Sequence, residues 1–132
     1  MKLTIYTDGG ARGNPGPAGI GVVIKTGERV IKKYGRYIGE TTNNQAEYRA
    51  LMSALEEAKE IGAKEVEIFM DSELVVKQLK GEYRVKDKDL APLFLKIHNL
   101  RVCFQKFAVT HIPRDRNKEA DKLVNEAIDK HK

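Results

Sequence analysis

Short apolar runs separated by turn-forming residues dominate the first forty positions of the chain. Residues 2–8 and 20–25 have the composition of β-strands, and the glycine- and proline-rich segment 9–19 between them predicts a turn. A third strand over 29–37 follows the second after a very short connection, which is typical of a β-hairpin. The chain therefore opens as an antiparallel meander.

The hydrophobic period changes near residue 44. Apolar residues recur at helical spacing over 44–61, and Gly62 supplies a stop. The further elements that the pattern predicts are a strand over 66–70, helices over 72–79 and 90–100, a strand over 104–112 and a helix over 117–130. The order βββαβααβα, without linker or repeat, predicts an α/β fold in which residues 1–132 form a single domain with one mixed sheet.

Two acidic residues fall where predicted strands end. Asp8 ends the first strand and Asp71 the fourth, and helical connections imply that these strands run parallel. Their carboxyl ends would then lie side by side, at the edge of an open α/β sheet where ligands bind. Two simpler interpretations remain at this point: Asp8 begins an Asx-type turn, or Asp71 belongs to the helix cap at Ser72.

Two further acids lie on predicted helices. Glu47 is four residues before Leu51, which places it at the top of the buried stripe; the alternative is a capping-box glutamate that reaches back to Asn44. Asp121 precedes Val124 by three residues, which turns it toward the protein. An acid beside an apolar stripe is also often a solvated flank, so the pattern alone leaves Asp121 open.

The predicted cluster of acids indicates a binding site for divalent metal ions. Unpaired carboxylates close together raise one another's pKa, and a hard divalent cation removes that cost. Oxygen ligands without sulfur suit Mg²⁺ or Mn²⁺, which retain water and accept phosphate oxygens. A net charge of +5 and a pI near 9.3 favour a polyanionic partner.

Cysteine content and hydropathy bear on the compartment. Cys103 is the only cysteine, which excludes an intramolecular disulfide and a thiolate-rich zinc site and fits a reducing cytosol. The N-terminal residues reach an acid and two glycines before any apolar stretch long enough for a signal sequence, and nothing downstream resembles a membrane span. We expect a cytoplasmic protein with no membrane partner.

Four motifs occur in register along nearly the whole chain. They are Thr7-Asp8-Gly9-Gly10 with Arg12-Gly13-Asn14-Pro15-Gly16-Pro17, then Thr42-Asn43-Asn44-Gln45-Ala46-Glu47-Tyr48, then Asp71-Ser72, then His111 with Asn117-Lys118-Glu119-Ala120-Asp121. Together they resemble ribonuclease H type 1, whose fold is shared with the nuclease domain of reverse transcriptases. The resemblance implies a ribonuclease H-like five-stranded mixed sheet flanked by helices, with three antiparallel N-terminal strands and two further strands parallel to the first.

The resemblance also implies roles for individual positions. The residues that match the family's metal-binding acids are Asp8, Glu47, Asp71 and Asp121. They would hold two ions of Mg²⁺ (or Mn²⁺), with Asp8 between them, and His111 resembles the family's assisting histidine. A lone histidine is usually structural, and that alternative stays open for His111. The positions that match substrate-binding residues are Gly9, Gly10, Ala11, Asn14, Thr42, Asn43, Gln45 and Ser72.

The activity implied by the resemblance is an endoribonuclease that hydrolyses the RNA strand of RNA–DNA hybrids without sequence preference. One metal would activate water and the other would stabilise the leaving 3′ oxygen, giving 5′-phosphate and 3′-hydroxyl ends. The resemblance implies that Asn14, Asn43 and Gln45 lie near the minor groove of the hybrid. It also implies that Thr42 belongs to a pocket for a DNA phosphate and that the Gly9–Ala11 backbone approaches the RNA strand. We expect a monomer.

Two departures from the family pattern affect substrate contacts. Glu73 stands where several members carry a glutamine that contacts bases, so a contact there is doubtful. The chain also lacks the basic helix and loop that some members insert, and so resembles the handle-less subgroup. The basic residues between Lys77 and Lys88, with Tyr83 among them, either replace part of that grip or form a solvated connector.

Two other functions fit the same motifs. One is a nucleic-acid-binding module that keeps the fold without cutting, against which the four acids argue. The other is an enzyme that acts on double-stranded RNA or on a junction, because fold alone does not determine the substrate.

Overall fold

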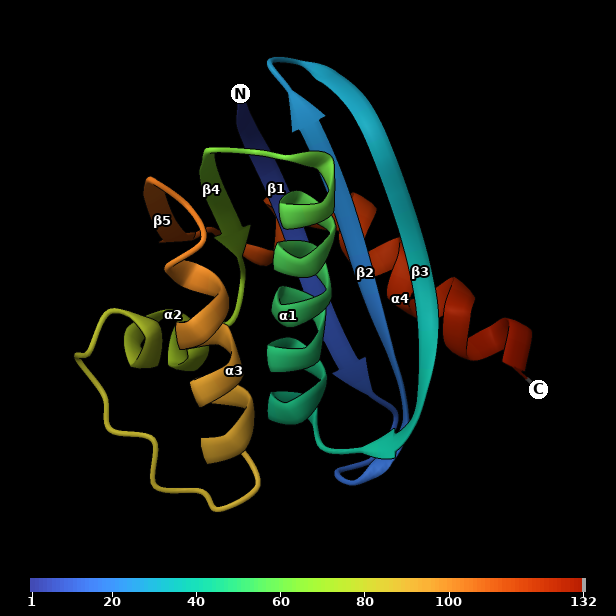
Figure 1. The fold of residues 1–132 in the computed structure, drawn as a ribbon. Coiled ribbons are helices and arrows are strands. Elements are labelled where there is room, and N and C mark those ends of the chain that lie inside the picture. Colours follow the sequence, from blue (N-terminus) through green and yellow to red (C-terminus); the bar gives the residue numbers. More distant parts are fainter. Residues whose placement is uncertain (132) are drawn as a thin grey trace.

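A computed structural model describes residues 1–131 of the chain (Figure 1). Its elements are β1 (Lys2–Ala11), β2 (Gly16–Thr26), β3 (Arg29–Thr41), α1 (Asn43–Ile61), β4 (Glu65–Met70), α2 (Glu73–Leu79), α3 (Ala91–Arg101), β5 (Lys106–His111), the 3₁₀ turn η1 (Arg114–Arg116) and α4 (Lys118–His131). The strands form one sheet in the order β3-β2-β1-β4-β5. β1 to β3 are antiparallel, and β4 and β5 run parallel to β1. The predicted fold class is confirmed.

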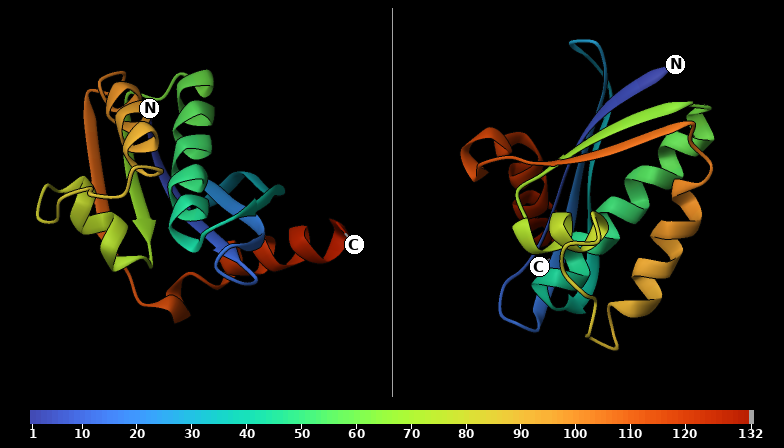
Figure 2. Two further views of the ribbon diagram at one scale, coloured as in Figure 1. Left: turned by 90° about the horizontal axis from the view of Figure 1, so that it is seen from below. Right: turned by 90° about the vertical axis from the view of Figure 1, so that its left-hand side faces the viewer.

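Helices cover the two faces of the sheet (Figure 2). α1 packs on β1 and β2 with α3 beside it, and α4 crosses β2 and β3 on the opposite face. The core between α1 and the sheet consists of fully buried aliphatic side chains such as Leu3, Ile5, Ile24, Leu51, Leu55 and Ile68. Burial of each such side chain stabilises the fold by about 1.5–3 kcal/mol, so the sheet and α1 form a rigid base for the residues at their ends.

α4 packs directly on the backbone of β2. A Cβ at Gly21 would lie 2.2 Å from the backbone oxygen of Ala120 in α4, so only glycine permits this approach. Ala120, Val124 and Ile128 form the buried stripe of the helix, as its apolar spacing predicts. The close packing sets the position of the next residue, Asp121.

The glycine-rich segment differs from its prediction. Residues 9–19 were expected to be a turn, but β1 continues to Ala11 and β2 begins at Gly16, so only residues 12–15 connect them. Asp8 therefore lies inside β1, paired with Gly21, and not at the strand end. Within 9–19 only Gly13 has a positive φ, the backbone conformation that favours glycine in a turn. The other glycines of this segment lie in the strands, where several of them allow close packing.

Other element boundaries move by a few residues. β3 extends to Thr41, beyond the predicted end at residue 37, and β5 spans Lys106–His111 inside the predicted 104–112. α1 begins at Asn43 with Thr42 as its N-cap. No helix within residues 1–131 has both the length and the apolar composition needed to cross a membrane.

Candidate active site

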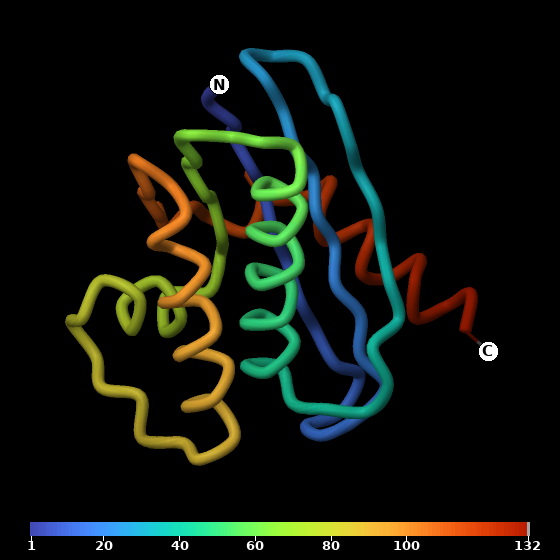
Figure 3. Tube along the Cα trace, viewed as in Figure 1, coloured from blue at the N-terminus to red at the C-terminus, as the bar shows by residue number. Residues whose placement is uncertain are grey.

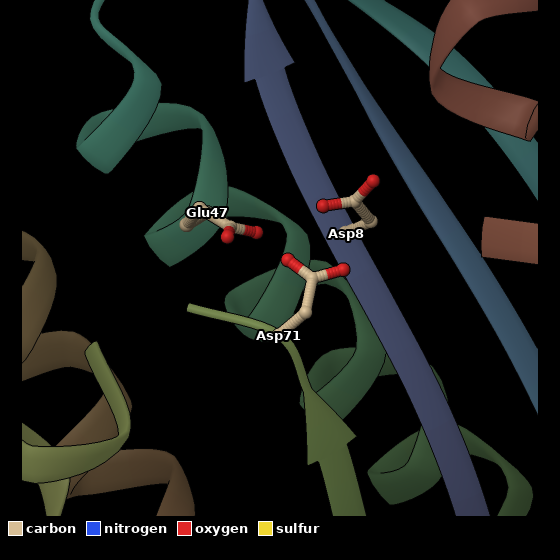
Figure 4. Close-up of side chains that lie close together, drawn as sticks. All are labelled: Asp8, Glu47 and Asp71. Carbon is tan, nitrogen blue, oxygen red and sulfur yellow. The ribbon is translucent and has the colours of Figure 1, made fainter. Parts of the chain in front are cut away.

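Three carboxylates from separate elements meet where β4 ends beside β1 (Figure 4). Asp8 comes from β1, Glu47 from the first turns of α1, and Asp71 from the residue that follows β4. One ligand oxygen from each lies within 4.8 Å of the others. The parallel pairing of β1 with β4 brings Asp8 and Asp71 together, as the sequence pattern predicts.

Glu47 reaches this cluster because α1 touches the backbone of β1. A Cβ at Gly9 would lie 2.2 Å from the backbone oxygen of Ala46, so a glycine is required there. The Gly9 N–H then donates a 2.7 Å hydrogen bond to Oε1 of Glu47. The N-cap of the helix is Thr42, whose Oγ1 accepts from the Gln45 N–H. The structure therefore excludes the capping-box interpretation of Glu47.

Burial and mutual repulsion weaken the acidity of two of these groups. Asp8 is 7% exposed, and desolvation followed by the charge of Asp71 raises its pKa to about 8, with further contributions from Asp121. Glu47 is 6% exposed, and its pKa is raised well above the ordinary value by desolvation and then by the charges of Asp8 and Asp71. The Gly9 hydrogen bond opposes the rise at Glu47. A cation bound by these oxygens would favour their ionised forms.

Asp71 is held in place by a buried amide that sequence reasoning assigned no role. Nδ2 of Asn117 donates to Oδ2 of Asp71 at 2.9 Å and to the backbone oxygen of Thr7 at 2.8 Å. Asn117 is 2% exposed, so its contacts tie the start of α4 to β1 and to the end of β4. The residue belongs to the last sequence motif, but an asparagine just before a helix reads as an ordinary cap.

Asp121 stands at the edge of the carboxylate cluster. It lies in the first turn of α4, lines the same pocket as the other three acids and has a side chain that is 35% exposed. Nη2 of Arg114 lies 3.9 Å from its Oδ1. The set of closely spaced ligand atoms contains Asp8, Glu47 and Asp71 and leaves Asp121 outside.

The four acids line a pocket of about 370 Å³. Among the predicted substrate-binding residues, its wall contains Gly9, Gly10, Ala11, Asn43 and Ser72. Arg12, Arg114 and Asn125 also line it, and sequence reasoning gave them no role in the site. Arg12 and Arg114 are the cationic side chains of that wall.

Known proteins resemble this chain in sequence and in fold. A family model described as reverse transcriptase-like matches residues 6–127. The crystal structure of RNase H1 from the archaeon Halobacterium salinarum superposes with a TM-score of 0.95 at 43% sequence identity, covering 98% of this chain and 99% of that chain. The chain belongs to the ribonuclease H family. The resemblance inferred from the motifs is confirmed.

Two further relatives of this ribonuclease H family member are informative. LC11-RNase H1, isolated from compost, was solved in complex with an RNA/DNA hybrid; it has a TM-score of 0.93 and 52% identity and covers 98% of both chains. A bifunctional protein of Mycobacterium tuberculosis is 44% identical over 131 residues, which are 98% of this chain and 36% of that protein. The chain spans about a third of the length of this mycobacterial relative and 65% of a curated halobacterial ribonuclease HI.

The other substrate-binding positions predicted for this ribonuclease H lie beside the pocket. Oδ1 of Asn14 accepts from the Asn43 N–H at 3.1 Å, and Oδ1 of Asn43 accepts from the Ala11 N–H at 2.8 Å. These bonds join the β1–β2 turn to the start of α1, which lie side by side in Figure 3. Gln45 accepts from Oγ1 of Thr41 at 2.6 Å. The positions thus form a connected polar surface next to the carboxylates.

His111 lies apart from the carboxylate pocket. It is the exposed last residue of β5, beside Met70 in the sheet. The pKa of Glu73 is lowered, first by its hydrogen bond and ion pair with Lys77 and also by the charge of His111. The structure thus places His111 near the start of α2, and its assisting role stays a prediction.

Proposed function

We propose that the protein is an endoribonuclease that hydrolyses the RNA strand of RNA–DNA hybrids, without sequence preference, and leaves 5′-phosphate and 3′-hydroxyl ends. The observation that carries this proposal is the convergence of Asp8, Glu47 and Asp71 in a polar pocket. The RNA/DNA hybrid bound to the related LC11-RNase H1 supports the choice of substrate. We propose that residues 1–132 act as a single catalytic domain.

The residues present fit a divalent metal site. The donors are all carboxylate oxygens, which Mg²⁺ and Mn²⁺ prefer, and two of them sit where burial opposes ionisation unless a cation is near. We propose that Asp8, Glu47, Asp71 and Asp121 hold two such ions. Bound there, the ions would supply an activated water and stabilise negative charge on the leaving oxygen.

The chain's own residues keep the acids in the required orientation. The Gly9 N–H fixes one oxygen of Glu47, and Nδ2 of Asn117 fixes one oxygen of Asp71. Preorganisation of this kind lowers the free energy that must be spent on ordering ligands when substrate binds. For Asp121 and His111 the proposed roles rest on their places in the family's motif.

Recognition of the RNA strand is proposed for the polar surface next to the pocket. Because Oδ1 of Asn14 and Oδ1 of Asn43 already accept backbone N–H groups, each side chain presents its Nδ2 as a donor. Such donors suit the sugar and groove oxygens of a duplex, and the 2′-hydroxyl is the group by which proteins distinguish RNA from DNA. The readout would ignore base identity.

A cleavage assay tests the proposal. Matched RNA–DNA, RNA–RNA and DNA–DNA duplexes are incubated with Mg²⁺, with Mn²⁺ and with EDTA, and the ends of the products are analysed. We expect metal-dependent cleavage of the RNA in the hybrid. Absence of such cleavage would refute the proposal, and preferential cutting of RNA–RNA would favour a double-stranded RNA substrate.

We also propose a monomer that works in the cytoplasm. The single cysteine, Cys103, suits a reducing compartment. Size-exclusion chromatography with light scattering would test the oligomeric state, and a dimer at the concentrations used in the assay would contradict it.

A further inference from the structure

The carboxylate pocket extends along the end of β1 to the cationic side chain of Arg12. Arg12 directly follows β1 and lines the pocket together with Val124, Asn125 and Ile128 of α4. Asp8 and Arg12 are four residues apart, which corresponds to about 13 Å along an extended strand. Arg12 is therefore too far along the strand to serve the same phosphate as the acids.

The guanidinium of Arg12 is held by α4. Nη1 donates to Oδ1 of Asp129 at 2.5 Å, and Nη2 donates to the backbone oxygen of Asn125 at 3.4 Å and to its Oδ1 at 3.3 Å. The side chains of Arg12 and Asp129 are 37% and 60% exposed. Exposed ion pairs contribute little to stability, because water screens the charges and both long side chains lose freedom.

The charges around the pocket indicate what could replace Asp129 as the partner of Arg12. The pocket wall concentrates four acids against Arg12 and Arg114, and Arg114 leans toward Asp121. A nucleic-acid strand that crosses the acids and continues along the pocket would bring further phosphates to Arg12. A guanidinium binds phosphate through two parallel N–H groups, as it binds a carboxylate, so a phosphate at this place competes directly with Asp129.

We infer that Arg12 binds a backbone phosphate of the RNA strand away from the cleavage point, and that Asp129 occupies the guanidinium until the substrate displaces it. The inference rests on the proposed ribonuclease activity and deepens it. Arg12 is a substrate-binding residue in this account. Asp129 is an internal competitor whose removal strengthens substrate binding.

Opposite effects of two substitutions test the inference. Arg12→Gln should raise KM for the hybrid about tenfold with little change in kcat, because a charge-assisted contact is lost. Asp129→Asn should lower KM about two- to fivefold, because an exposed ion pair no longer competes. The double variant should behave as Arg12→Gln alone.

Salt dependence gives a second readout. Hybrid binding by fluorescence anisotropy, in the Asp8→Asn background that prevents cutting, is measured between about 50 and 200 mM salt. Arg12→Gln should reduce the steepness of the plot of log affinity against log salt by about one phosphate contact. Lys122→Gln is the matched control, since it removes one cation and one exposed ion pair from α4 outside the pocket.

The outcomes separate the inference from the proposed function. Equal losses in Arg12→Gln and Asp129→Asn, or no loss in Arg12→Gln while the wild type cleaves the hybrid, would overturn the role of Arg12 alone. A wild-type protein that neither cleaves nor binds the hybrid would overturn both. Thermal unfolding of each variant checks that the fold is unchanged, which the exposure of the pair leads us to expect.

Discussion

Replacing Asp8 by asparagine should stabilise the metal-free protein while abolishing cleavage. Asp8 is 7% exposed and faces Asp71, and desolvation and this charge together raise its pKa from 3.8 to about 8. Asparagine has nearly the same shape and carries no charge. The substitution therefore removes a repulsive group from the folded state and leaves the packing of β1 intact.

The magnitude follows from the linkage between proton binding and folding. Because the pKa in the folded chain is raised, ionisation of Asp8 costs nothing below the unfolded pKa, and stability is lost as pH rises toward the folded pKa. Between 3.8 and about 8 the loss grows by about 1.4 kcal/mol per pH unit, reaching roughly 4 kcal/mol at neutral pH. We expect Asp8→Asn to recover about half of this, roughly 2 kcal/mol, because the new amide is itself buried.

Thermal unfolding in EDTA measures the effect. At about pH 8 the variant should melt roughly 6–10 °C above the wild type, whereas at about pH 4, where Asp8 is protonated, the buried amide should leave the variant less stable than the wild type. Saturating Mg²⁺ should stabilise the wild type more than the variant, because only the wild type has the complete ligand set. Asp115→Asn, in the exposed η1 turn, is the control and should show no such pH-dependent difference. A variant that is no more stable than the wild type at about pH 8 in EDTA would refute the electrostatic argument.

Three further substitutions probe the geometry around the acids. Asn117→Ala should lower kcat at least about tenfold, because Asp71 loses the donor that orients it, and should destabilise the fold by about 1–3 kcal/mol, because the Thr7 carbonyl loses a buried donor. An unchanged rate in the cleavage assay would show that Asp71 does not need this hydrogen bond. Gly9→Ala should impair folding and cleavage by separating α1 from β1, whereas Gly10→Ala, whose Cβ would lie 3.7 Å from Val124, should leave the urea unfolding midpoint nearly unchanged. His111→Ala should lower the cleavage rate in part, and an unaffected rate would return His111 to a structural role.

The sequence alone predicts the carboxylate cluster because its members depend on topology. The helical connection that precedes β4 makes β4 run parallel to β1, so Asp8 and Asp71 are predicted at the same side of the sheet, and the pairing of β1 with β4 brings them together. The apolar stripe of α1 directs Glu47 to the same place. These arguments need only the period of the hydrophobic pattern and the order of the elements.

The sequence does not show why a glycine stands at a given position or which distant residue a polar side chain contacts. Gly9 and Gly16 look like parts of one turn, yet the first allows α1 to touch β1 and the second begins β2. Only the packed structure distinguishes close approach from turn conformation. Asn117 and Arg12 likewise show their roles through partners that lie far away in sequence, Thr7 and Asp129.

The four acids are held by two different parts of the fold, which the sequence motifs do not show. Asp8, Glu47 and Asp71 belong to the sheet and to α1, whose core is fully buried. Asp121 instead depends on α4, which Asn117 ties to the sheet at one end and Arg12 ties to the β1–β2 turn at the other. Asn117 itself is buried, whereas the ion pair of Arg12 is exposed and exchangeable. Substrate that displaces Asp129 would therefore act on the C-terminal part of α4 and leave Asp121, in its first turn beside Asn117, in place.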